Sequence, residues 1–115
     1  MTDAPWTLGR GSPVIVYLHS PREKVWGVLL SLDASGVCVR GLDLRIFDEW
    51  MRQEARGEEQ LLGVSTLFYP MNRLERIELD ERVGPVPAYS DRFQEEVGRS
   101  AVEAVGIADD RGRGN

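Results

Sequence analysis

The chain has 115 residues, which suits a single domain able to bury its own hydrophobic core. Its net charge of −5 does not favour the tight, non-specific nucleic-acid binding that depends on many Lys and Arg side chains. No apolar run approaches the roughly 20 residues of a membrane-spanning helix, and residues 1–6 lack the pattern of a secretory signal, so we expect no membrane partner.

Three β-prone segments follow one another in the first half of the chain. They cover residues 13–19, 24–33 and 37–42. The intervening segments contain Pro21 and Gly36 and have the length of tight turns, so we predict an antiparallel meander. The second segment is apolar on both faces, as is typical of a central strand, and Gly27 marks a point where it can bend.

The hydrophobic period changes after the third of these segments. Large apolar side chains then recur with helical spacing, and polar side chains fill the opposite side. We therefore predict an amphipathic helix of about three turns in an insert spanning residues 45–57, with Gly57 at its end. Asp48 and Arg52 have the spacing of an ion pair on its polar side.

Two shorter strands are predicted in the second half of the chain, at residues 64–69 and 74–79. The segment between them, residues 70–73, begins with a proline and has the length of a compact turn. These two strands form a second hairpin.

A helical extension is predicted at about residues 90–107. Ser90 has the position of an N-cap for a helix that ends at Gly98, and Ser100 has capping-box spacing for a shorter helix. Residues 108–115 are too polar and glycine-rich to pack, so we expect a disordered tail.

These elements predict a mainly β fold with one domain over residues 1–107. Five strands over about residues 12–80 form a small, bent, antiparallel barrel, with the helix inserted between the third and fourth strands. We expect Trp26 in the core and Trp50 between helix and barrel, whereas Trp6 is open between core packing and a stacking surface.

Two segments resemble the paired sequence motifs of the Sm-like (LSm) family. Residues 25–33 have a glycine in the second strand, alternating apolar residues and Asp33 six positions after that glycine, and residues 66–77 match the second motif in length and hydrophobic pattern. The resemblance covers about residues 12–80 and extends to uncharacterised bacterial Sm-like proteins with a Phe-Tyr-Pro-Met segment. It implies an Sm-like (SH3-like) barrel whose strand edges, here at residues 67–69 and 77–79, join neighbours, hence a homo-oligomer, with a ring as one form. The alternative is that the helices at about residues 46–56 and 90–97 cover these edges and keep the protein a monomer or dimer.

The residues that give such barrels their usual RNA pocket are different here. RNA-binding Sm proteins have an asparagine shortly after the first-motif aspartate and an Arg-Gly pair in the second motif. In this chain residues 34–36 are Ala-Ser-Gly, and residues 70–71 are Pro-Met. RNA binding of Sm type with non-standard contacts is therefore the alternative. Its candidate nucleic-acid or ligand contacts are Arg40, Tyr69, Asn72 and Arg73.

Three arginines, Arg40, Arg73 and Arg76, have two interpretations. If their side chains converge, they form a site for a phosphate or carboxylate group. Pairing with nearby acidic residues is the interpretation that we favour, because mixed charges of this kind usually make a solvated surface.

No catalytic set of side chains is recognisable. His19 is the only histidine, and Cys38, the only cysteine, alternates with valines in a strand, where a small apolar role is expected. Cysteine usage also favours a reducing compartment, so we expect a cytoplasmic protein. We expect no enzyme activity, no cofactor and no metal, and we rank an enzyme or small-ligand pocket last. The leading hypothesis is a non-enzymatic Sm-like module that self-associates and serves as an assembly or binding scaffold.

Overall fold

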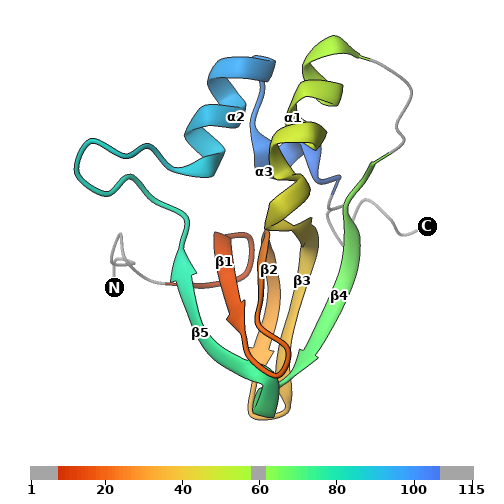
Figure 1. The fold of residues 1–115 in the computed structure, drawn as a ribbon, viewed down its shortest axis with the longest axis vertical. Coiled ribbons are helices and arrows are strands. Elements are labelled where there is room, and N and C mark those ends of the chain that lie inside the picture. The colour runs from red at the N-terminus through yellow and green to blue at the C-terminus, as the bar shows by residue number, and fades with distance from the viewer. Residues whose placement is uncertain (1–7, 58–61, 107–115) are drawn as a thin grey trace.

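The computed structural model describes residues 8–57 and 62–106. The predicted tail at 108–115 and the lead-in with Trp6 lie outside the described residues. Five antiparallel strands form one sheet in the order β4-β3-β2-β1-β5 (Figure 1). The strands are β1 (Pro13–Leu18), β2 (Glu23–Asp33), β3 (Gly36–Asp43), β4 (Ser65–Pro70) and β5 (Leu74–Leu79). All five lie where the sequence predicts them, and the predicted mainly β fold is confirmed to this extent.

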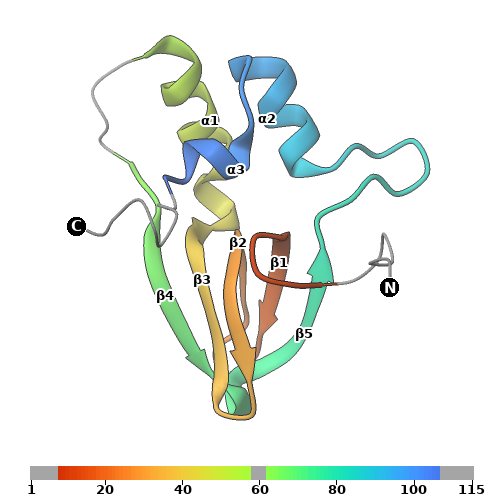
Figure 2. The same ribbon diagram turned by 180° about the vertical axis from the view of Figure 1, so that it is seen from behind.

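The helices gather at one end of the sheet, and Figure 2 shows the same arrangement from behind. They are α1 (Phe47–Arg56), α2 (Tyr89–Val97) and α3 (Ala101–Ala104), with 3-10 turns η1 (Leu44–Ile46) and η2 (Met71–Arg73). The inserted helix is confirmed, and it ends at Gly57 in a left-handed conformation, as predicted. The predicted compact turn between the last two strands is the 3-10 turn η2. The predicted second hairpin is wrong, because β4 pairs with β3 and β5 pairs with β1, at opposite margins of the sheet.

The alternation of side chains along the strands gives the sheet two apolar faces. One face, which we call the helix face, packs against the three helices. Its centre is an aromatic cluster in which Trp26 of β2 lies 5.2 Å from Phe47 and 5.8 Å from Trp50 between ring centroids, as the prediction for Trp26 and Trp50 requires. The second face is filled by seven buried aliphatic side chains: Val14, Val16, Leu18, Val25, Leu29, Val37 and Val39.

Strands β2 and β3 approach each other closely at a pair of glycines. Gly27 lies opposite Gly41 in the antiparallel register. A Cβ atom on Gly41 would lie 2.1 Å from the carbonyl oxygen of Trp26 and 2.6 Å from the Cα of Gly27, so no side chain fits there. A register shift between Leu29 and Ser31 interrupts the same pair of strands. The glycine predicted to mark a bend is therefore one half of a close backbone contact.

The helical extension is attached to the sheet through Asp80, which directly follows β5. The Asp80 carboxylate is buried and accepts hydrogen bonds from Trp26 Nε1 at 3.0 Å and from the backbone N–H groups of Tyr89 and Ser90, both at 2.8 Å. The prediction that Ser90 caps this helix is wrong, because α2 already begins at Tyr89 and a carboxylate distant in sequence caps its first turn. The predicted cap of α3 is confirmed, since the Ser100 hydroxyl accepts from Val102 N–H at 3.1 Å.

Ion pairs connect the helices differently from the sequence prediction. Arg52 pairs with Glu49 at 3.0 Å, and Asp48 pairs with Arg92 of α2 at 2.7 Å, so the predicted Asp48–Arg52 pair is wrong. Helices α1 and α2 lie side by side and run in the same direction, since Asp48 and Arg92 pair near their first turns and Glu54 and Arg99 pair near their ends. This packing provides a partner on a second helix that helical spacing alone does not reveal.

Candidate functional site

The two outer strands of the sheet, β4 and β5, have edges with no strand partner among the described residues. Figures 1 and 2 show them at opposite margins of the sheet, curving toward each other where η2 joins them. An unpaired edge presents backbone N–H and C=O groups to any chain that can align with it. These edges are the first candidate site.

The direction of the β4 amides follows from one hydrogen bond. Met71 N–H donates to the Ser35 carbonyl at 2.9 Å, just beyond the last registered pair of β3 and β4. Because hydrogen-bonded pairs alternate along an antiparallel ladder, the N–H groups of Thr66 and Phe68 point away from β3. The carbonyl of Pro70 points the same way, but proline has no N–H to offer.

The outward amides of β5 alternate in the same way. Asp80 N–H donates to the Pro13 carbonyl at 2.8 Å, so the N–H groups of Ile77 and Leu79 point away from β1. The side chains of this strand differ from those of β4. β4 has no charged residue, whereas three of the six side chains of β5 are charged, namely Glu75, Arg76 and Glu78.

Phe68 lies in the middle of β4 with 56% of its surface exposed. It pairs with Cys38 in the register, on the side of the sheet that carries the helix face. Its ring lies against Gly36, where a Cβ atom would come within 2.6 Å of the ring carbon Cζ. A large aromatic side chain is therefore held in place at an edge without being buried by this chain.

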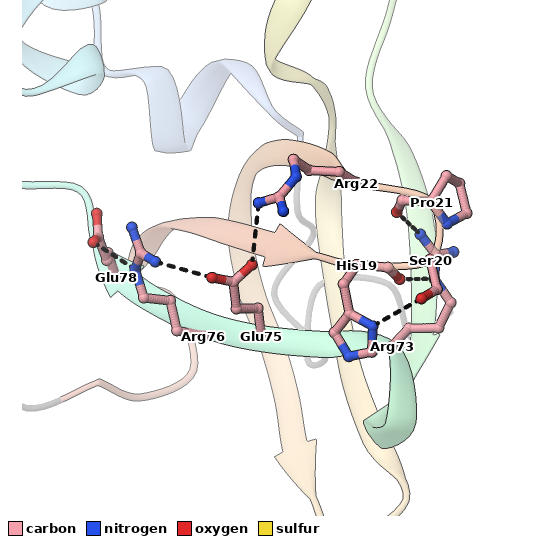
Figure 3. A network of polar contacts seen from close by, with 8 residues as sticks. All are labelled: His19, Ser20, Pro21, Arg22, Arg73, Glu75, Arg76 and Glu78. Carbon is pink, nitrogen blue, oxygen red and sulfur yellow. Dashed lines mark hydrogen bonds and ion pairs between the residues drawn. The ribbon is translucent and has the colours of Figure 1, made fainter.

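Arg73, one of the predicted ligand contacts, holds a turn of its own chain. Its Nε donates to the His19 carbonyl at 3.0 Å, and its guanidinium also donates to the Pro21 carbonyl at 2.8 Å (Figure 3). A contact with Glu23 at 3.3 Å completes its set of partners. The guanidinium therefore joins the turn between β1 and β2 to η2, and its donors are directed inward.

Asn72 lies within η2 and Tyr69 lies near the end of β4, so both are close to Arg73 in the chain. The Arg73 guanidinium carbon is 5.9 Å from the centre of the Tyr69 ring, and Asn72 is exposed. Partial burial, reinforced by the negative charge of Glu23, raises the pKa of Tyr69, so its hydroxyl stays protonated at neutral pH. The structure brings three of the four predicted contact residues together here.

Arg40 lies elsewhere. Its Nε donates to the Val105 carbonyl at 3.2 Å, and it reaches the Thr66 hydroxyl at 3.3 Å on the helix face. The Tyr69 side chain packs against the second face. Arg40 and Tyr69 are therefore on opposite sides of the sheet and do not form one site.

Arg76 belongs to a charged network on β1 and β5. Its guanidinium donates to Glu78 at 2.8 Å (Figure 3). It also lies 3.9 Å from the centre of the Tyr17 ring, and the Tyr17 hydroxyl donates to Glu78 at 3.0 Å. The hydrogen bond from Arg76 lowers the pKa of Glu78. Partial burial of Tyr17 raises the pKa of its hydroxyl, and the hydrogen bond to Glu78 raises it further. Pairing of this arginine with nearby acids is confirmed, and the three arginines do not converge.

An open groove of about 760 Å³ lies between the β1–β2 turn and the end of β3. It is lined by Pro21, Arg22, Glu23, Lys24, Asp43, Leu44 and Arg45. Both of its carboxylates already hold an arginine, since Asp43 pairs with Arg45 at 2.9 Å and Glu23 with Arg73. The hydrogen bond from Arg45 lowers the pKa of Asp43, which therefore stays ionised at neutral pH.

The two residues expected to be structural have ordinary surroundings. His19 is exposed, and its Nδ1 lies 3.1 Å from the Ser20 hydroxyl. Cys38 is half-buried rather than enclosed. It pairs with Phe68 of the edge strand β4, and its side chain lies on the same side of the sheet as the helix face. Within residues 8–57 and 62–106, no group of three His, Cys, Asp or Glu side chains is placed to hold a metal ion, and no helix is long and apolar enough to cross a membrane.

Comparisons with family models, with curated proteins and with solved structures found no match to this chain. The function of the strand edges, of the group formed by Tyr69, Asn72 and Arg73, and of the groove is therefore inferred from their geometry.

Sequence reasoning identified the edge segments but missed the residues that distinguish one edge from the other. The side on which Phe68 lies depends on the register between β3 and β4, which a single sequence does not supply. The contrast in charge between residues 65–70 and 74–79 was legible in the sequence and is the signal that could have separated the two edges.

Proposed function

We propose that this protein is a non-enzymatic, Sm-like module that self-associates through the free edge of its sheet and serves as an assembly or binding scaffold. The observation that carries the proposal is the uncharged edge of β4, with its outward amides and an exposed Phe68. Natural sheets usually blunt or cover such an edge. An edge left open in this way is suited to strand addition.

The strand order and η2 agree with the Sm-like interpretation. A meander of β1, β2 and β3, then an inserted helix, then two strands joined by a short turn, is the order of elements that the resemblance implies. The second face, with its seven buried aliphatic side chains, would be the interior of the barrel. A cytoplasmic location belongs to the same proposal and is supported by the single free cysteine.

Self-association is tested by size-exclusion chromatography with light scattering on the full chain. We expect a mass above the 12.9 kDa of one chain that increases with protein concentration. Because one six-residue strand buries less surface than the roughly 800 Å² per partner of a standard interface, the series should extend to several hundred micromolar. A mass of one chain throughout that range would contradict the proposal.

The alternative of an Sm-type RNA-binding module receives less support. Arg73 is occupied by backbone carbonyls, Arg40 faces the other side of the sheet, and only Asn72 of the predicted polar contacts is exposed without such a role. A cluster with its guanidinium already engaged offers little to a phosphate.

We therefore expect short single-stranded RNAs to show no salt-sensitive binding at micromolar protein. Fluorescence anisotropy at low salt is the measurement, because phosphate contacts are strongest there. Binding that weakens as salt is added, and that Asn72→Ala reduces while the exposed control Glu81→Ala does not, would favour the RNA-binding function over the scaffold.

A further inference from the structure

We infer that the partner of β4 is the β4 strand of a second copy, paired antiparallel about a two-fold axis at Phe68. This inference rests on the proposed self-association and states which edges meet. It predicts a closed dimer, because a two-fold contact uses the same surface on both copies. Pairing of β4 with β5 of the next copy would instead be head-to-tail and would give a ring or a filament.

The backbone of β4 fits itself in this register. The N–H and C=O of Phe68 both point outward, so two copies of Phe68 can exchange reciprocal hydrogen bonds in a narrow antiparallel pair. Thr66 N–H then faces the Pro70 carbonyl of the second copy. Pro70 is the position on this edge that has no N–H, so each Thr66–Pro70 pair is joined by one hydrogen bond and the outward Thr66 carbonyl receives none across the axis.

The side chains agree with the same axis. Directly opposed residues in an antiparallel pair have Cβ atoms roughly 4.5–5.5 Å apart, and aromatic pairs there are favourable. The axis places Phe68 against Phe68 of the second copy and removes both rings from water. Among the described residues Phe68 is one of five large apolar side chains that are exposed, and Met71, which follows β4 directly, is another at 39%.

The β5 edge is a poorer partner for β4. On the side of the sheet where Phe68 lies, β5 presents Arg76 and Glu78, which are about half-exposed and engaged with each other and with Tyr17. Covering this network with an aromatic side chain would remove water from charged groups without adding a partner to them. Charged side chains on an edge strand are one of the usual ways in which proteins prevent pairing.

The test compares the same substitution at the middle of each edge. Phe68→Arg puts like charges directly opposite each other across the proposed axis and removes the aromatic pair, whereas Glu78→Arg puts the same side chain on β5. We expect Phe68→Arg to raise the dimer dissociation constant by at least about tenfold and Glu78→Arg to leave it within about twofold. Sedimentation equilibrium of the full chain gives the constants, and circular dichroism confirms that each variant is folded.

A backbone variant keeps the test informative if Phe68→Arg does not fold. Thr66→Pro removes an N–H that points away from β3, so the monomer keeps its ladder, but the dimer loses an inter-chain hydrogen bond on each side of the axis. It should weaken the dimer as Phe68→Arg does.

The outcomes separate this inference from the proposal on which it rests. A wild-type dimer that only the β4 variants dissociate supports the inference. An assembly larger than a dimer, or a dimer that Glu78→Arg dissociates and the β4 variants do not, overturns the β4 pairing and leaves self-association intact. A wild type that is monomeric at every concentration overturns both.

Discussion

Replacing Asp80 with alanine is expected to lower the free energy of unfolding by about 3 kcal/mol, which is the range for a lost charged acceptor that leaves buried donors unpaired. Asp80 is only 7% exposed, and its carboxylate accepts from Trp26 Nε1 and from the first two N–H groups of α2. Trp26 is fully buried, so its Nε1–H loses its acceptor when the carboxylate is removed. Urea denaturation followed by tryptophan fluorescence and by far-ultraviolet circular dichroism measures the change.

Glu81→Ala is the matched control for Asp80. It removes one carboxylate from the adjacent residue, but Glu81 is exposed, so its loss should change stability by no more than about 0.5 kcal/mol. A difference between the two variants of less than about 1 kcal/mol would contradict the role given to Asp80, since hydrogen bonds to a buried charge are worth more than that.

Gly41→Ala is the second substitution with a large expected effect. The new Cβ atom would meet backbone atoms of β2, including the Trp26 carbonyl at 2.1 Å, and backbone cannot move aside as a flexible side chain can. The two central strands would have to separate at the point where both faces of the sheet are packed. We expect a loss of about 3 kcal/mol, at the upper end of the usual cost of overpacking.

Gly9→Ala provides the control for the glycine substitution. Gly9 has no atom within 4 Å of an added Cβ and no positive φ, so alanine there should be neutral to within about 0.5 kcal/mol or slightly stabilising. If thermal or urea unfolding shows the same stability for both variants, the close approach of Gly27 and Gly41 is not required by the fold.

The strands were predictable because their signals are local. Residues 13–19, 24–33 and 37–42 combine β-branched residues with turn residues at both ends, and the structure follows these limits closely. The helical insert was equally visible, because four large apolar residues share one face and Gly57 ends it.

The contacts between distant segments were not predictable in the same way. Asp80 caps α2 across the intervening loop, and Asp48 pairs with a residue of α2 and not with Arg52. Each of these two contacts depends on how two elements pack against each other. Helical spacing or a local cap predicts the partner only when no residue from another element lies closer. The close contact at Gly41 was not predictable for the same reason, because only the register between β2 and β3 shows that Gly41 faces Gly27.

For the candidate site, the sequence supplied the right segments and an incomplete interpretation. Tyr69, Asn72 and Arg73 do lie together, but Arg73 is used to hold the β1–β2 turn. Its partners are carbonyl oxygens, which every residue has and which therefore leave no trace in the sequence. The role proposed for Phe68 depends on the alternation of inward and outward amides along β4, which directs its N–H away from β3 at the edge of the sheet.

The most direct measurement of the central claim is amide hydrogen exchange by NMR at low and high protein concentration. The N–H groups of Thr66 and Phe68 have no acceptor within the sheet, so each should exchange rapidly in dilute solution and become protected as the β4 edges pair. The outward N–H groups of Ile77 and Leu79 on β5 should not change with concentration. Protection that is independent of concentration at Thr66 and Phe68, or that develops on β5 instead, would contradict association through β4.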